Sequence, residues 1–196
     1  MIEKLIELDK KLFLFLNGLH VDWLDSVMLY ATQTYVSIPL YVLLLFFIFK
    51  DQRKASWAPL LGIILAIVMA DQITSSIMKP FFQRFRPTHD PTIQNLVHIV
   101  NGYKGGRFGF ASSHAANTFA VATFFTLLFA HKTRWILLLY LWCAVISYSR
   151  IYLGVHFPGD ILGGFVIGFL SALAGFGFYV WIRRMLEKNR SFSGST

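Results

Sequence analysis

The chain has 196 residues, of which 56% are hydrophobic and only 14% are charged, and its formal net charge is +8. Soluble domains carry about 25% charged residues, so this chain has too little polar surface to coat a water-soluble globule. The cations form short clusters between apolar runs, a pattern that favours anionic lipid headgroups over nucleic acid as the partner. The single cysteine, Cys143, excludes an intrachain disulfide. Composition therefore predicts one membrane-embedded domain, residues 1–196.

The N-terminal residues 1–22 predict an amphipathic helix that lies on the membrane surface. Between residues 2 and 16, charged side chains alternate with leucine, isoleucine and phenylalanine, as in helices that bury one face in the lipid interface. A helix that packs on its own bundle explains the same pattern equally well. Residues 13–28 are a candidate for a sixth span, but several polar residues within them argue against it.

Five later segments are apolar enough to cross a bilayer core, which needs about 20 mainly apolar residues per helix. They cover residues 30–49, 57–78, 110–130, 135–149 and 159–182. This pattern predicts an all-α, polytopic transmembrane helix bundle of about five to six spans. The carboxylate of Asp71 lies inside the second segment, and its role is left open by the sequence.

Two segments are too polar to be spans. Residues 79–109 form the only long connection, which contains three prolines and a glycine-rich stretch, and long loops in compact proteins are often functional. Residues 189–196 are small and polar, and they predict a flexible tail.

The five segments define two sides of the membrane. The N-terminus and the connections 79–109 and 150–158 share one side, and residues 50–56, 131–134 and the C-terminus share the other. Leaving aside cations assigned below to chemistry, the second side is richer in lysine and arginine. We therefore expect the C-terminus to be cytoplasmic and the 79–109 loop to be periplasmic.

Three polar clusters interrupt the apolar background, and the predicted topology puts all of them on the periplasmic side. The first is Lys79, six residues, then Arg86-Pro87. The second is Ala111-Ser112-Ser113-His114. The third is Ser149-Arg150, five residues, His156, three residues, Asp160. Each lies at the end of a predicted span, so we expect them to converge on one pocket at the membrane face.

The cations of these clusters predict a phosphate site. Lys79, Arg86 and Arg150 come together without a matching set of carboxylates, which is costly near a low-dielectric boundary unless an anion lies among them. Arginine suits bidentate contact with phosphate oxygens. We expect the Ser112 hydroxyl and the Ser113 amide, at the start of a span, to join them.

The remaining groups predict phosphoryl transfer to a histidine. His156 and Asp160 are four residues apart, so the carboxylate can accept the proton on one ring nitrogen and leave the other free to attack phosphorus. His114 is then the acid that protonates the leaving oxygen and later the base that activates water. No carboxylate cluster of metal-binding type is present in the sequence, so this mechanism requires neither a metal nor a cofactor.

These clusters resemble the signature of the type-2 phosphatidic acid phosphatase superfamily, which also includes the vanadium haloperoxidases. Its pattern is Lys, six residues, Arg-Pro; then Pro-Ser-Gly-His; then Ser-Arg, five residues, His, three residues, Asp. The first and third motifs match at every fixed position. In the second, Ala111 and Ser113 replace proline and glycine, whereas Ser112 and His114 are retained.

The resemblance implies an all-helical bundle whose site faces the periplasm in bacterial members. It implies that His156 is the nucleophile, Asp160 its partner and His114 the acid. It also implies that four residues hold the phosphate: Lys79, Arg86, Ser112 and Arg150.

The sequence therefore predicts an integral-membrane, metal-independent phosphatase that acts on an envelope lipid by way of a phosphohistidine. Undecaprenyl diphosphate, phosphatidylglycerol phosphate, phosphatidic acid and the phosphates of lipid A all suit a cationic pocket beside a bilayer. An anion-binding or transport protein without hydrolysis is the alternative, although it gives His156 and Asp160 no task. A vanadate-dependent oxidant ranks last, because those relatives are soluble.

Overall fold

The computed structural model describes residues 1–193, with side chains placed through residue 188. Within this range the chain is helical, and its one β contact is an isolated bridge between Phe85 and Phe108. The predicted all-α bundle is confirmed. The α-helices are α1 (Ile2–Asn17), α2 (Asp22–Ala31), α3 (Ile38–Gln52), α4 (Trp57–Gln72), α5 (Lys79–Phe82), α6 (Ser113–Phe129), α7 (Leu139–Tyr152) and α8 (Pro158–Ser193).

Short helical turns connect these helices and lengthen some of them. A π-helical segment, Ile73–Met78, joins α4 to α5 without a break. The 3₁₀ turns are Thr34–Ser37, Arg53–Ala55, Pro87–His89, Gln94–Leu96 and Arg134–Leu138.

Four continuous helical stretches are long and apolar enough to cross a membrane: Thr34–Ala55, Trp57–Phe82, Arg134–Tyr152 and Pro158–Lys188. Counting α1 and α2 as one span, despite the bend of 115° between them, gives five. The segment predicted at 110–130 is α6, a shorter apolar helix of 17 residues. It begins three residues later than predicted because Ser112 caps it.

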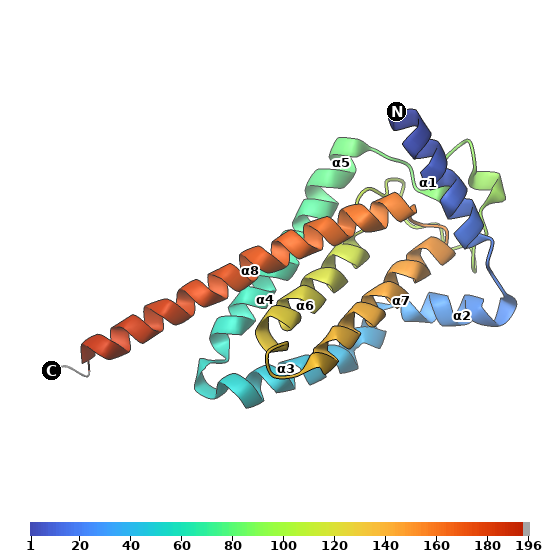
Figure 1. Cartoon of the computed structure of the whole chain (residues 1–196). Coiled ribbons are helices and arrows are strands. Elements are labelled where there is room, and N and C mark those ends of the chain that lie inside the picture. The colour runs from blue at the N-terminus through green and yellow to red at the C-terminus, as the bar shows by residue number, and fades with distance from the viewer. Residues whose placement is uncertain (194–196) are drawn as a thin grey trace.

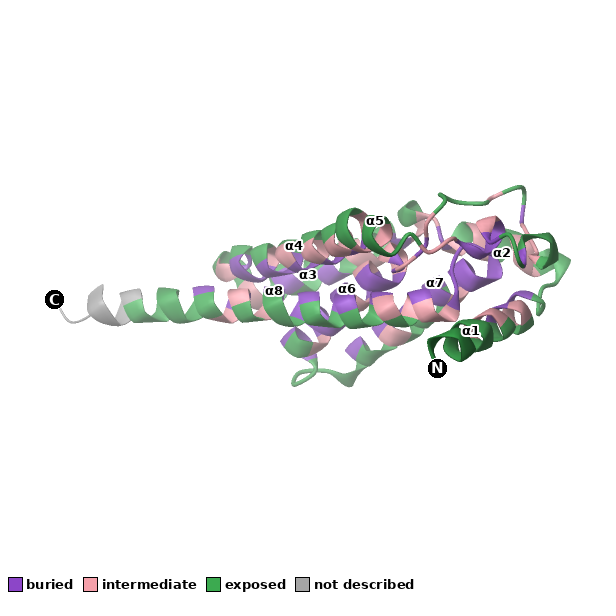
Figure 2. Cartoon of the chain, turned by 90° about the horizontal axis from the view of Figure 1, so that it is seen from above, coloured by how far each residue is buried: buried purple, intermediate pink, exposed green. Residues whose placement is uncertain are grey.

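Helix α6 lies at the centre of the bundle, where it packs against α4, α7 and α8 (Figure 1). Most residues of α6 are buried, whereas many residues of α3 and α8 are exposed (Figure 2). Many of the exposed ones are large and apolar, as on surfaces that contact lipid: Val42, Phe46, Phe49, Val166, Leu170 and Leu173.

Glycines allow the central helices to approach closely. A Cβ at Gly62 of α4 would lie 2.8 Å from the Gly175 carbonyl oxygen of α8. A Cβ at Gly168 would overlap the Ala116 carbonyl of α6, and one at Gly164 would lie 2.5 Å from the Ser112 carbonyl oxygen. The starts of α6 and α8 are therefore side by side, which places two of the three polar clusters together.

The two ends of the bundle match the predicted sides. The loops at 50–56 and 131–134 meet at one end, where Lys132 pairs with Asp51. At the other end lie α1, the loop that follows α5 and the starts of α6 and α8 (Figure 1). The three polar clusters belong to this second end.

Helix α1 packs on the bundle through one face. Phe13 is fully buried and meets the Phe157 ring edge-on, with centroids 5.3 Å apart. Asn17 donates to the Tyr152 carbonyl at 2.8 Å. Leu5 and Leu8, nearer the start of the helix, are exposed. The placement of α1 in a membrane interface stays a prediction, whereas its packing on the bundle is observed.

At the C-terminus, α8 continues to Ser193. The helix thus includes the beginning of the segment 189–196, for which the sequence predicts a flexible tail. The rest of that segment, residues 194–196, lies outside the described residues.

Candidate active site

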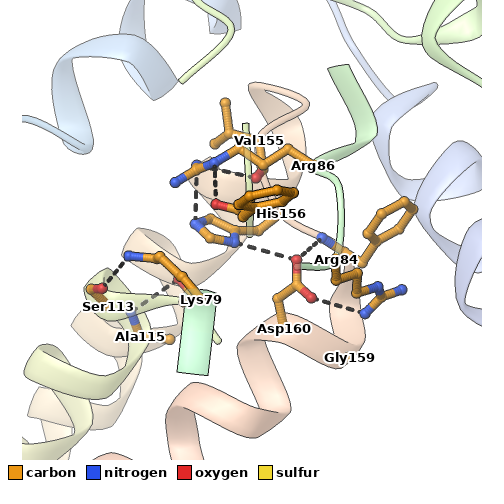
Figure 3. Close-up of polar contacts among 12 residues, drawn as sticks. Lys79, Arg84, Arg86, Ser113, Ala115, Val155, His156, Gly159 and Asp160 are labelled. Atoms are coloured by element: carbon orange, nitrogen blue, oxygen red, sulfur yellow. Dashed lines mark hydrogen bonds and ion pairs between the residues drawn. The ribbon is translucent and has the colours of Figure 1, made fainter. Parts of the chain in front are cut away.

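The predicted site residues come from several elements that meet at one end of the bundle (Figure 3). Lys79 begins α5 and Arg86 lies in the following loop. Ser113 and His114 occupy the first turn of α6, directly after Ser112. The others follow in the last turn of α7, the next loop and the first turn of α8: Arg150, His156 and Asp160.

His156 and Asp160 form the expected pair. The Nδ1 atom of His156 lies 3.4 Å from Oδ2 of Asp160, which also accepts from the Phe157 amide at 3.0 Å. Both side chains are buried, with exposed fractions of 1% and 0%. The turn between α7 and α8 holds the His156 amide against the Arg150 carbonyl oxygen at 3.3 Å.

The other ring nitrogen of His156 faces Arg86. Nε2 lies 3.3 Å from Nη1 of Arg86. A guanidinium can only donate, so Nε2 is the acceptor and the ring proton lies on Nδ1, toward Asp160. Burial, with the charges of Arg86 and Arg150, holds the pKa of His156 well below its ordinary value. The imidazole is therefore neutral at neutral pH, with its free lone pair directed at the cations.

Arg86 is fixed by the loops around it. Its Nε donates to the Phe108 carbonyl at 3.1 Å, and Nη1 donates to the Val155 carbonyl at 3.2 Å. Burial and the neighbouring Arg150 lower the pKa of the Arg86 guanidinium to about 10. It keeps its positive charge at neutral pH and is held beside the Nε2 atom of His156.

Arg150 and Lys79 are bound by hydroxyl groups. Arg150 donates from Nη1 to Thr32 Oγ1 at 2.5 Å and from Nη2 to the Tyr103 hydroxyl at 3.1 Å. Its buried Nε has no hydrogen-bond partner within the described residues. Lys79 donates to Ser113 Oγ at 2.7 Å.

None of the ion pairs among the side chains of residues 1–188 includes Lys79, Arg86 or Arg150. These three cations have no carboxylate partner, and the Nε–H group of Arg150 has no hydrogen-bond acceptor among the described residues. Together they form a site for a multiply charged oxyanion. Residues 1–193 bring together no group of three or more histidine, cysteine, aspartate or glutamate side chains that could hold a metal ion.

His114 lies in the wall of a polar cavity of about 270 Å³. Its lining includes Asp71, so that carboxylate belongs to the neighbourhood of the site. Asn117 donates to Asp71 Oδ1 at 3.3 Å, and its own Oδ1 has no partner among the described residues. The other lining residues are mainly hydroxyl or amide side chains: Thr32, Gln33, Thr34, Ser37, Tyr41, Ser113, Thr118 and Ile146.

A family model, that of the PAP2 superfamily, matches residues 60–184 of this chain. The chain belongs to the PAP2 superfamily. The matched segment contains every predicted site residue, whereas α1 precedes it.

Named relatives agree with this assignment. The lipid A 4′-phosphatase of Bacteroides thetaiotaomicron is 38% identical over 194 residues, which cover 97% of this chain and 84% of that protein. The crystal structure of Aquifex aeolicus LpxE is 27% identical, with a TM-score of 0.64 over 87% of this chain and 95% of that one. The transmembrane PAP2-type phosphatidylglycerolphosphate phosphatase of Bacillus subtilis is 26% identical, with a TM-score of 0.68 over 89% and 86%. This PAP2 protein is an integral membrane enzyme that hydrolyses phosphate esters.

Two positions depart from the PAP2 pattern stated above. Ala111 is fully buried beside α8, where Gly163 approaches it. Ser113 places a hydroxyl where the pattern has none, and its Oγ contacts Lys79, Thr74 Oγ1 and Ser75 Oγ at 2.7, 3.0 and 3.0 Å. The Ser113 side chain therefore orients the Lys79 ammonium.

The Ser112 hydroxyl caps α6, since its Oγ accepts from the Ala115 amide at 3.4 Å. As an acceptor there, Ser112 keeps its own hydroxyl proton available to donate. It is fully buried. Its predicted contact with phosphate is therefore compatible with its capping role.

Two residues of this end were missed by the sequence analysis. Arg84 Nη1 donates to Asp160 Oδ1 at 2.8 Å (Figure 3). Arg84 Nη2 donates to Asp9 Oδ2 at 2.6 Å. Arg84 lies two residues before Arg86, so a closer reading of that loop could have singled it out. No sequence signal links Asp9 to α8, because nearly the whole chain separates them.

Proposed function

We propose that this protein removes a phosphate from a membrane lipid whose headgroup is a sugar, as in lipid A, through a phosphohistidine at His156. The observation that carries the proposal is the orientation of His156. Its Nδ1 faces Asp160 at 3.4 Å and its Nε2 faces Arg86 at 3.3 Å. A neutral imidazole fixed in this way presents its lone pair where cations would hold phosphorus.

In the first step, Nε2 of His156 attacks phosphorus. The N–P bond forms as the bond from phosphorus to the lipid oxygen breaks, and the departing oxygen takes a proton from His114. Arg86 transfers its hydrogen bond from Nε2 to a phosphate oxygen, which frees the lone pair for attack. Lys79 and Arg150 stabilise charge on the other equatorial oxygens.

In the second step, His114 takes a proton from water. The resulting hydroxide attacks phosphorus, the N–P bond breaks, and its electron pair returns to Nε2 of His156. Inorganic phosphate leaves the cations, and His114 holds the proton for the next leaving group. The lipid phosphate, one water molecule and the proton carried by His114 balance both steps.

The polar cavity supports a sugar as the leaving group. The leaving oxygen must lie beside His114, and His114 forms part of the cavity wall. The lining hydroxyl groups, the Asp71 carboxylate and the unpaired Asn117 oxygen suit a headgroup rich in hydroxyls. An isoprenoid chain would leave these groups without partners. The name of the Bacteroides thetaiotaomicron relative, a lipid A 4′-phosphatase, agrees with this choice.

We also propose that the site faces the periplasm and that the C-terminus is cytoplasmic. The cluster of cations near the C-terminal end of α8 and in the loops 50–56 and 131–134 supports this orientation. It would give the enzyme access to lipids of the outer leaflet.

Phosphate release tests the function directly. Full-length protein in detergent, with excess chelator, is offered lipid A, phosphatidylglycerol phosphate, phosphatidic acid and undecaprenyl diphosphate. We expect the fastest release from lipid A, and none from His156→Ala. His131→Ala, an exposed histidine at the opposite end, is the matched control and should equal wild type.

Each alternative has its own outcome. Equal release by wild type and His156→Ala would overturn the phosphohistidine. Faster release from a lipid without a sugar would overturn the substrate assignment. Folded protein that binds inorganic phosphate but releases none from any lipid would favour anion binding without hydrolysis.

A further inference from the structure

The carboxylate of Asp160 is held from two sides. Its Oδ2 faces His156 and the Phe157 amide. Its Oδ1 accepts from Arg84 Nη1 at 2.8 Å, and Arg84 in turn donates from Nη2 to Asp9 Oδ2 at 2.6 Å. A line of charged groups thus runs from Asp9 of α1 through Arg84 and Asp160 to His156, the proposed nucleophile. Figure 3 shows its last three members, Arg84, Asp160 and His156.

The line is attached to the helix start of α8 at a second point. Asp9 Oδ1 accepts from the Gly159 amide at 2.8 Å, so one carboxylate of α1 contacts both Arg84 and the first turn of α8. A Cβ at Gly159 would lie 2.7 Å from Asp9 Oδ2. This residue therefore leaves room for the approach of α1.

Packing keeps Arg84 in one conformation. Its guanidinium carbon lies 4.2 Å from the centroid of the Phe157 ring, a cation–π distance. The same ring also packs against Phe13 of α1. The side chains of Arg84 and Asp9 have exposed fractions of only 25% and 16%, and that of Asp160 is 0%.

Without Arg84, the Oδ1 atom of the buried Asp160 carboxylate would lack a hydrogen-bond donor. The carboxylate would then rotate toward another donor or take up a proton. Either change removes the acceptor that orients the His156 ring. Groups that orient a catalytic side chain from outside typically affect rate without contacting substrate.

We propose that Arg84 and Asp9 are positioning residues for the Asp160–His156 pair, so that α1 contributes to turnover through the Asp9 carboxylate. The proposal rests on the phosphatase function proposed above. It makes α1, which lies outside the residues matched by the family model, a working part of the enzyme.

A second ion pair of α1 supplies the matched control. Lys10 lies 2.7 Å from Asp90 and donates to Thr92 at 2.8 Å, so it also joins α1 to the 79–109 loop. Its exposure is similar, at 24% for Lys10 and 12% for Asp90. Among the contacts of the described residues, neither Lys10 nor Asp90 reaches His156 or Asp160. Lys10→Gln therefore removes one contact between α1 and the loop but leaves the contacts among Asp9, Arg84 and Asp160 in place.

The test measures kcat and KM of full-length variants in detergent, on whichever lipid of the panel the wild type hydrolyses fastest. We expect Arg84→Gln to lower kcat by about 10- to 100-fold with KM little changed. Asp9→Asn should lower kcat less, by about 3- to 10-fold, because Arg84 still contacts Asp160. Arg84→Lys should recover part of the loss, and Lys10→Gln should remain within about twofold of wild type.

The double variant Arg84→Gln/Asp160→Asn distinguishes a positioning role of Arg84 from a general loss of structure. If Arg84 acts through Asp160, adding Arg84→Gln to Asp160→Asn costs nothing further. An equal further loss in that background would overturn the proposal. So would full activity of Arg84→Gln, or a loss in Lys10→Gln as large as that in Asp9→Asn.

Folding and function failures are distinguishable. Thermal unfolding midpoints show whether Arg84→Gln is folded, and Asp9→Asn, the milder change, carries the test if it is not. A wild type that releases no phosphate would instead refute the proposed function. Active wild type, inactive His156→Ala and unimpaired Arg84→Gln would refute only the positioning role.

Discussion

At the end of the bundle that carries His156, largely buried polar side chains connect segments that lie far apart in the chain, whereas at the opposite end the segments are joined by an exposed ion pair. Arg150 of α7 reaches Thr32 beyond α2, and Arg84 reaches Asp9 of α1. At the opposite end, Lys132 pairs with Asp51 across the surface, with the lysine side chain 47% exposed.

This difference indicates that the charges at the two ends have different roles. Buried charges are expensive, and they persist where the structure uses them to hold an anion or orient a reacting group. An exposed pair at a loop contributes about 0–1 kcal/mol and is screened by salt. Substitutions at the two ends should therefore change different properties of the protein.

The largest contrast is expected between Arg150→Ala and Lys132→Ala. Arg150 is 2% exposed and has a buried Nε without a partner in the described residues, so we assign its free donor to phosphate. Its removal should lower kcat/KM by about 10²- to 10³-fold, the effect of losing one donor to a developing oxyanion. Lys132→Ala should leave kcat/KM within about twofold, because its ion pair is exposed.

Phosphate release and the thermal midpoint of both variants check this contrast. Arg150→Lys adds a control, since it keeps the charge but loses the planar fork, and it should fall between the two. Comparable kcat/KM values for Arg150→Ala and Lys132→Ala would contradict the assignment of Arg150 to the phosphate site.

The motif residues could be predicted from the sequence because short spacings and span ends govern where they lie. His156 and Asp160 are separated by one turn at the start of α8, so their contact follows from local geometry. Hydropathy located the helices and placed the loops 79–109 and 150–158 at one end. Both steps use information that is local in the chain.

The Arg84–Asp9 contact and the Asp71 cavity could not be predicted, because they depend on how helices dock. Asp9 occupies one of several charged positions on α1, and only the packing of Phe13 against Phe157 selects it. The start of α6 was predicted too early for a different reason. Phe110 and Ala111 are apolar, but they precede Ser112, which caps the helix. Hydropathy alone does not register the capping residue.

An intermediate effect is expected at the close contact between α6 and α8. Gly168→Ala places a Cβ against the Ala116 carbonyl, whereas a Cβ at Gly177 of the same helix meets nothing within 4 Å. Overpacking of this kind costs about 1–3 kcal/mol, so Gly168→Ala should lower the thermal midpoint. Gly177→Ala should be neutral or stabilising by about 0.5–1 kcal/mol, since alanine favours helix.

Because Gly168 lies on α8 after Asp160, and Asp160 contacts Ser112 at the start of α6, its substitution should also lower kcat. The Ser112 amide donates to the Asp160 carbonyl at 3.0 Å, and separation of the two helices would stretch this bond. Thermal unfolding and phosphate release are measured on both variants. Equal midpoints for Gly168→Ala and Gly177→Ala would contradict the close approach of α6 and α8.

The smallest effect expected is a shift in the pH profile on replacing Arg86. Burial and the charges of Arg86 and Arg150 hold the pKa of His156 well below its ordinary value. The neutral ring is the nucleophile, so activity is present above that pKa and is lost as pH falls through it. Removing one cation with Arg86→Gln relieves repulsion of the protonated ring and should raise the pKa of His156.

The acid limb of kcat/KM should therefore move to higher pH in Arg86→Gln, in addition to any loss of rate. Arg86→Lys keeps a positive charge beside His156 and should leave the limb nearly in place while still lowering the rate. The lipid substrate is the same in all three proteins, so its own ionisation cancels in the comparison. A limb that is unmoved in Arg86→Gln, or displaced equally in both variants, would mean that the charge of Arg86 does not keep His156 neutral. Arg86 would then act by contact with phosphate alone.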